Sequence, residues 1–164
     1  MRLQRHLDVF VVIVLGCAAL FVFALTNTGI DVDDAYISYR YMENLASHGE
    51  AVYNLGDRVY GSTAMLWVFV IALLSRITSA SAEHTANIVA AVLTVCNAAL
   101  SYTLVRHLGG SRSLAVVAAV ALLSYPLFAL VSTLGMETAL LTALMLVCFL
   151  AFMREWPFRT GLLA

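Results

Sequence analysis

The chain has 164 residues, of which 62% are hydrophobic and 12% are charged, and its mean hydropathy is +0.92. Soluble domains are about half apolar and about a quarter charged, so a soluble core of this size could not bury so much apolar surface. The net charge of −1 and the absence of lysine argue against nucleic-acid binding. The composition therefore predicts an integral membrane protein whose surroundings are a lipid bilayer.

The first predicted element is a membrane-spanning helix over residues 9–25. A spanning helix needs about 20 predominantly apolar residues, within a range of about 17–25. This run is longer than the apolar core of a signal peptide, and no small-residue cleavage site follows it. We therefore expect a retained anchor.

A long first loop, residues 26–84, follows this span. Loops of such length are usually functional or disordered, and the tyrosines and aliphatic residues spread along this one predict packed structure. Residues 33–48 are predicted to form an amphipathic helix, with carboxylates in the first turn and Gly49 as the C-terminal stop. Ile37 and Tyr41 belong to an apolar series that recurs every four residues and is expected to face the membrane.

The second half of the loop is predicted to contain an extended segment and a second helix. Residues 50–61 are expected to be extended, with a turn at Gly56. The apolar run 64–75 holds only 12 residues before the next charge, which is too short to span a bilayer. We expect it to be an interfacial helix, capped by Ser62 or Thr63.

Three further uncharged runs, residues 86–105, 114–131 and 138–153, are predicted to span the membrane. Pro126 is expected to kink the second of these three helices. With the first anchor they make four spans. The predicted fold is thus an all-α membrane protein, a single module over residues 1–164 with two interfacial helices in its long first loop.

The distribution of charge predicts the orientation of these spans. Arg2 and Arg5 precede the first span, so the N-terminus is expected to be cytoplasmic. Four spans then place six arginines and two acids in the cytoplasm, a net charge of +4, and three arginines and eight acids outside, a net charge of −5. A fifth span over residues 64–75 would destroy this separation.

The adjacent carboxylates Asp33 and Asp34 are the first candidates for a site. Acids in a first helical turn often serve only to satisfy backbone N–H groups and oppose the helix dipole. The functional interpretation is that one acts as general base, while the other binds a divalent metal or orients its partner. Neighbouring helical side chains diverge by about 100°, so the two acids are not expected to share one task.

Two further candidates lie on the same predicted outer side. Arg40 follows Asp33 by two helical turns and shares a face with it and with Tyr36, where it could hold a phosphate. The alternative is a surface ion pair with Glu43. Glu137 begins the last span, where it could serve the helix dipole or contribute to a substrate site.

Three segments together resemble the first outer loop and a second shared segment of GT-C membrane glycosyltransferases. The resemblance is closest to polyprenyl-phosphate-sugar-dependent transferases of the mycobacterial arabinofuranosyltransferase type. It lies in Asp33-Asp34-Ala35-Tyr36-Ile37-Ser38-Tyr39-Arg40-Tyr41, in Val52-Tyr53-Asn54-Leu55-Gly56-Asp57-Arg58-Val59, and in Ser132-Thr133-Leu134-Gly135-Met136-Glu137-Thr138-Ala139.

This resemblance implies a carboxylate pair at the active site, which Asp33 and Asp34 match. It implies a polyprenyl-phosphate-linked sugar as donor, a glycan or other hydroxyl acceptor, and an inverting displacement outside the cytoplasm at the plasma membrane. Arg40 or a divalent metal, held by Asp34, would steady the departing phosphate, with Tyr36 and Glu137 as candidates for substrate binding.

Members of this family are longer than this chain, so we expect the 164 residues to be the N-terminal portion of a larger enzyme. The alternative hypothesis is a small multi-span transporter or membrane assembly subunit whose outer loop docks a partner. Transporters usually place ionisable groups near the bilayer midplane. The four predicted spans contain no such groups, which argues against a transporter.

Overall fold

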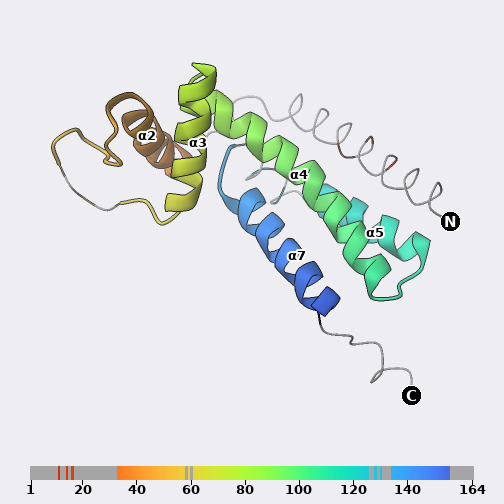
Figure 1. Ribbon diagram of the computed structural model, residues 1–164. Coiled ribbons are helices and arrows are strands. Elements are labelled where there is room, and N and C mark those ends of the chain that lie inside the picture. The colour runs from red at the N-terminus through yellow and green to blue at the C-terminus, as the bar shows by residue number, and fades with distance from the viewer. Residues whose placement is uncertain are drawn as a thin grey trace.

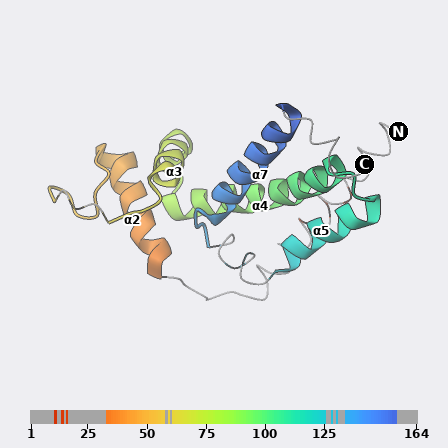
Figure 2. The ribbon, with the colours of Figure 1, turned by 90° about the horizontal axis from the view of Figure 1, so that it is seen from below.

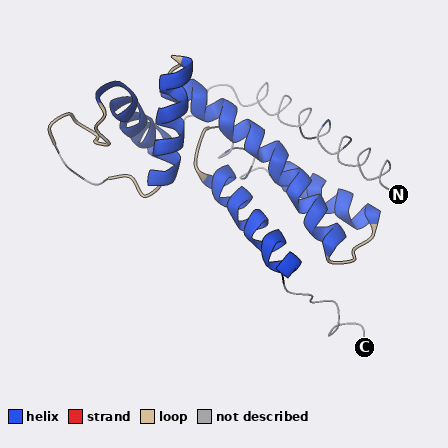
Figure 3. Cartoon of the chain, viewed as in Figure 1, coloured by secondary structure: helices blue, strands red, loops and turns tan. Residues whose placement is uncertain are grey.

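The computed structural model describes residues 11, 14, 16, 33–57, 59, 61–125, 128, 130 and 134–155. Within these residues the fold is all-helical and contains no strand (Figure 3). The five helices are α2 (Asp33–His48), α3 (Met65–Thr78), α4 (Ala82–His107), α5 (Arg112–Ser124) and α7 (Thr138–Glu155), labelled as in Figure 1. The helical class predicted from the sequence is confirmed for this part of the chain.

The helices form a bundle with a separate helical pair at one end. α4 lies between α5 and α7 and contacts both (Figure 2). α2 and α3 pack together at the end where α4 and α7 begin (Figure 1). At the far end, the chain reverses between α4 and α5 at Gly109, whose φ of 84° favours glycine. The long loop of the sequence is therefore gathered at one end of the bundle.

α4 is the one helix in the described residues that is long and apolar enough to cross a membrane, judged by length and composition. It contains the predicted span 86–105, and Ser81 caps its N-terminus, because the Ser81 hydroxyl accepts the N–H of His84 at 3.2 Å. α3, α5 and residues 138–153 of α7 are apolar but shorter. Four spanning helices therefore stay a prediction.

The third predicted span, residues 114–131, differs from the structure at its C-terminal end. α5 ends at Ser124, and Tyr125 has extended backbone angles, with φ of −74° and ψ of 110°. Tyr125 precedes a proline, whose ring disfavours helical angles in the residue before it. Residues 128 and 130 are helical again. The interruption lies where the kink at Pro126 was predicted, but α5 ends at Ser124, before the proline, so the segment is not one bent helix.

Small residues recur along the contacts of α4 with α5 and α7, and many large apolar residues of these three helices are exposed. α4 buries small residues at every fourth position, and α5 and α7 add alanines of their own. These residues are Ala82, Ala86, Ala90, Thr94 and Ala98 in α4, Ala115 and Ala119 in α5, and Ala139 and Ala143 in α7. Close packing through small residues, with large apolar side chains turned outward, is typical of helices in a bilayer.

The loop follows the prediction closely up to its second helix. α2 has the predicted bounds, and Gly49 follows it with φ of 77° while its N–H bonds to the carbonyl of Leu45 at 3.1 Å. The predicted turn is formed at Gly56, with φ of 81°. α3 begins at Met65 after Ala64, which makes no side-chain capping bond, so the predicted cap by Ser62 or Thr63 is wrong.

One residue of the predicted membrane-facing series is placed differently. Tyr41 is 1% exposed, and its hydroxyl donates to the carbonyl of Val59 and accepts the N–H of Gly61, both at 2.8 Å. The expectation that Tyr41 faces the membrane is wrong, because its polar tip is used to hold the loop backbone. Ile37 from the same series is exposed.

The predicted first span, residues 9–25, lies outside the described residues except at positions 11, 14 and 16. Arg2 and Arg5, on which the predicted orientation depends, lie outside them as well.

Candidate functional site

The acidic pair stands at the start of α2. Asp33 and Asp34 form its first turn, and both side chains are exposed. Consecutive helical positions point about 100° apart, so the two carboxylates face different directions. The expectation that they do not share one task stays a prediction.

Asp33, Tyr36 and Arg40 occupy positions i, i+3 and i+7 of α2, and all three are exposed. They share one face of the helix, as the sequence predicts. At a rise of 1.5 Å per residue, the Cα atoms of Asp33 and Arg40 lie about 10 Å apart. We call these three residues the outer stripe of α2.

Tyr39 lies on the buried side of α2, next to Tyr36, and links this helix to the rest of the bundle. Its ring is 6% exposed and meets the ring of Tyr36 edge to face, with centroids 5.6 Å apart. Its hydroxyl lies within hydrogen-bonding reach of two acceptors, the carbonyl oxygen of Leu134 and Oδ1 of Asn87, the latter at 3.2 Å. Tyr39 thus joins the outer stripe to the segment that precedes α7.

Burial raises the pKa of Tyr39 well above its usual range, and the negative charge of Glu83 and the proximity of Tyr36 raise it further. The phenol therefore keeps its proton throughout the physiological pH range. A protonated hydroxyl donates a hydrogen bond, so the link to the carbonyl oxygen of Leu134 is maintained across that range.

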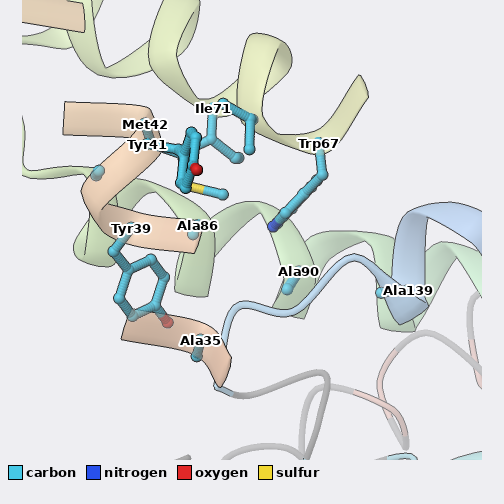
Figure 4. Packing of buried hydrophobic residues seen from close by; sticks show 11 residues of the cluster. Ala35, Tyr39, Tyr41, Met42, Trp67, Ile71, Ala86, Ala90 and Ala139 are labelled. Carbon is cyan, nitrogen blue, oxygen red and sulfur yellow. The ribbon is translucent and has the colours of Figure 1, made fainter. Parts of the chain in front are cut away.

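The segment before α7 receives a second bond from α3. Nε1 of Trp67, a residue that is 1% exposed, donates to the carbonyl oxygen of Gly135 at 2.8 Å. Figure 4 shows Tyr39 and Trp67 entering the core from their two different helices. Residues 134 and 135 therefore accept hydrogen bonds from both α2 and α3, in addition to the packing of these helices against α4.

Gly135 has no room for a side chain. Its φ is 67°, and a Cβ there would lie 2.6 Å from Oδ1 of Asn87 and 2.7 Å from the hydroxyl of Tyr39. Both the backbone angle and the close approach require glycine. We call Tyr39, Trp67, Asn87, Leu134 and Gly135 the anchor cluster.

Glu137 follows the anchor cluster by two residues. It is partly exposed, and its carbonyl accepts the N–H of Leu141 at 3.0 Å, so it lies at the start of α7 as predicted. The described contacts link it to α2 through Leu134 and Tyr39. Glu137 and the acidic pair thus belong to segments that the anchor cluster joins.

Arg40 holds the extended part of the loop. Its Nε donates to the carbonyl oxygen of Tyr53 at 3.2 Å, which uses one of five guanidinium donors. Asn44, one turn further along α2, donates to the carbonyl oxygens of Val52 and Tyr53 at 2.8 and 3.0 Å. The alternative pair of Arg40 with Glu43 is not among the contacts of the described residues.

A metal site at Asp34 has few donors within the chain itself. In the described residues no three or more His, Cys, Asp or Glu side chains form a group that could hold a metal ion. Mg²⁺ is commonly bound by one or two carboxylates, with phosphate oxygens and waters completing the shell. The donor set therefore fits a metal only if a phosphate group of the substrate supplies ligands, and the metal role of Asp34 stays a prediction.

Sequence reasoning did not identify Tyr39, Asn87 or Trp67 as positioning residues. The signal that could have found them is a tyrosine and a tryptophan on apolar helix faces, because their polar tips need partners when buried. Comparison of the chain with protein-family models, curated proteins and solved structures finds no match. The likeness to GT-C transferases therefore rests on the quoted segments alone.

Proposed function

We propose that the chain is the N-terminal portion of an integral membrane glycosyltransferase of the GT-C type. It would transfer a sugar from a polyprenyl-phosphate donor to an extracytoplasmic glycan or other hydroxyl acceptor, with inversion. The observation that carries this proposal is the outer stripe of α2, which presents a carboxylate, an aromatic ring and a guanidinium along one exposed helix face.

The outer surface of the neighbouring helix supports a position at the membrane. α3 exposes a stripe of large apolar residues, each between 53 and 70% exposed: Leu66, Phe69, Leu73 and Ile77. Its opposite face packs against α2. A helix pair with one aqueous face and one apolar face suits a substrate whose tail lies in lipid and whose sugar lies at the surface.

The proposed topology places this helix pair outside the cytoplasm of a plasma membrane crossed by four helices. Acidic residues gather at the end of the bundle that holds α2 and α3, whereas Arg106 and Arg112 lie at the opposite end, beside the α4–α5 turn (Figure 1). Arginine is enriched on the cytoplasmic side of membrane proteins, which supports this orientation.

In the proposed reaction, the acceptor oxygen attacks the anomeric carbon while the bond from that carbon to the phosphate oxygen breaks. The acceptor proton passes to the carboxylate of Asp33, and the phosphate leaves with the bonding electrons toward Arg40. An inverting displacement needs base and leaving group on opposite sides of the sugar. The spacing of about 10 Å between the two residues along α2 leaves room for a sugar ring.

The remaining candidates have supporting roles in this proposal. The ring of Tyr36 lies between base and arginine on the outer stripe, where it can pack against the sugar. Asp34 would orient Asp33 or hold a divalent metal that shares its shell with the phosphate. Glu137 would contact the acceptor from the start of α7.

The test is transfer from a polyprenyl-phosphate sugar by the natural full-length protein in membranes. We expect Asp33→Asn to lower turnover about 10²- to 10⁴-fold, because the base is lost while shape and size are kept. If Asp34 only orients Asp33, Asp34→Asn should lower turnover less than Asp33→Asn does. Asp57→Asn, an exposed acid in the turn of the same loop, is the matched control and should keep normal turnover.

Near-normal turnover in both Asp33→Asn and Asp34→Asn would remove the catalytic assignment. Repeating the assay with a chelator separates the two roles of Asp34. Full activity after complete chelation would leave this residue an orienting role only.

A further inference from the structure

A pocket of about 490 Å³ lies between the C-terminal half of α2, the end of α3 and the start of α4. It begins at Arg40 and extends away from the acidic pair as far as His48. Apart from Arg40, none of the residues assigned to sugar transfer lines it. The pocket thus shares Arg40 with the outer stripe and otherwise consists of residues to which the proposed sugar transfer gives no role.

Positive charge prevails among the side chains that line this pocket. Arg40 from α2 and Arg76 from the last turn of α3 contribute guanidinium groups, and Glu43 contributes the one carboxylate of the lining. Ser81 and Ala82 bring the first turn of α4 to the wall, where the partial positive charge of a helix N-terminus adds to that of the arginines. The lining therefore favours an anion.

Ser75 provides an independent sign of a ligand. It lines the pocket and is 5% exposed, and its hydroxyl has no hydrogen-bond partner in the protein. Helical hydroxyls commonly bond to the carbonyl four residues back, as Thr78 does to Leu74 at 2.9 Å. Because a buried hydroxyl without a partner is unfavourable, a ligand that accepts a hydrogen bond from it would satisfy it.

The pocket also adjoins the apolar surface of α3. Arg76 lies in the sequence beside Ile77 and one turn after Leu73, and those two side chains are 70 and 60% exposed. A molecule with its anionic group at Arg76 could therefore lay an acyl chain against this stripe. A pocket beside an apolar surface suits the anionic headgroup of a lipid, although the residues of the pocket itself would contact only the anionic group.

We propose that this pocket binds a phosphate group, carried by a membrane lipid or free in solution. Arg76 and Arg40 supply charge-assisted hydrogen bonds, and the hydroxyl of Ser75 donates to a phosphate oxygen. The inference goes beyond the proposed sugar transfer, because it concerns binding alone and would stand if the chain transferred no sugar.

The test is isothermal titration of the purified full chain in neutral detergent, with inorganic phosphate and with short-chain phosphatidic acid as the two probes. We expect Arg76→Gln to weaken binding about tenfold or more, since it removes charged hydrogen bonds. Ser75→Ala should weaken binding several-fold while leaving thermal stability equal or higher, because it removes an unsatisfied buried group. Arg112→Gln is the control: it removes one positive charge at the far end of the bundle, and its affinity for both probes should equal that of the unmodified chain.

Tighter binding of phosphatidic acid than of inorganic phosphate would identify the ligand as a lipid headgroup, and equal binding would identify the phosphate group alone. Both results support the pocket. The absence of saturable binding by either probe would overturn it, as would equal affinities in Ser75→Ala and the unmodified chain. The serine variant keeps the test decisive even if Arg76→Gln folds poorly.

Discussion

α2 and α3 are neighbouring helices of similar length, 16 and 14 residues, that pack against each other and have opposite outer surfaces. The exposed face of α2 carries charged and polar groups, among them Asp33, Arg40 and Glu43. The exposed face of α3 is a stripe of leucine, phenylalanine and isoleucine. Although the two helices pack against each other, the outer surface of α2 is therefore polar and the outer surface of α3 is apolar.

Their inner faces, by contrast, use the same chemistry. Each helix contributes an aromatic residue with a polar tip to the anchor cluster, Tyr39 from α2 and Trp67 from α3, and each of these bonds to a carbonyl in residues 134–135. The buried hydrogen bonds of Tyr39 and Trp67 therefore fix the position of both helices against residues 134–135. The apolar outer face of α3 is what the proposed position at the membrane requires, because a soluble protein rarely exposes a continuous apolar stripe.

The largest effect should come from Gly135, to which both helices are tied. Gly135→Ala places a Cβ against Asn87 and Tyr39 in a backbone conformation that alanine disfavours. We expect a loss of about 2–4 kcal/mol in the free energy of unfolding, with loss of proposed transfer activity. Thermal unfolding in detergent measures it, and Gly56→Ala is the control, because its φ is also positive but its surroundings are open. Equal losses in the two variants would show that crowding at the anchor cluster is unimportant.

A smaller effect should separate the two outer surfaces. Leu73→Glu adds a charge to the apolar stripe of α3, whereas Ser47→Glu adds one to the exposed side of α2. In lipid vesicles the first should cost about 1–3 kcal/mol of stability and the second less than about 0.5 kcal/mol. Unfolding midpoints compared in vesicles measure the difference. Similar midpoints for both variants would contradict the assignment of α3 to the lipid side.

The smallest effect concerns the attachment of α2 alone. Tyr39→Phe should lower the free energy of unfolding by about 1–2 kcal/mol at neutral pH, because it removes the bond to Leu134. Burial raises the pKa of Tyr39 in the folded chain, so above about pH 10 the unfolded chain loses this proton while the folded chain retains it. Stability contributed by Tyr39 is then lost as pH rises.

The difference in stability between the unmodified chain and Tyr39→Phe should therefore stay constant from about pH 7 to about pH 9 and narrow as the pH rises to about 11. Thermal unfolding of both proteins across this range measures it. A difference that stays constant, or widens, would show that burial of the phenol does not govern its ionisation.

Local signals account for the elements that the sequence predicted well. The acids at residues 33 and 34 and the glycine at 49 delimit α2, and uncharged runs locate α4 and α7. Prediction was wrong where tertiary contacts compete with local preference. Ser62 is buried and does not cap α3, and Tyr41 bonds to the loop backbone and does not meet the membrane.

The candidate site shows the same division. The outer stripe could be predicted because a helix places residues 33, 36 and 40 on one face whatever surrounds it. The anchor cluster could not, because Tyr39, Trp67 and Gly135 are far apart in the chain and no spacing rule connects them. The pocket at Ser75 likewise needs three helix ends to meet.

The sequence by itself determined the helical class, the apolar character and the bounds of α2, because these depend on composition and on periodicity within single segments. Only the tertiary structure decided which face of each helix is inside. It also decided that residues 134–135 hold α2 and α3 together, through the carbonyls that accept bonds from Tyr39 and Trp67. The physical reason is that buried polar groups must find partners, and those partners come from whichever segment the packing brings near.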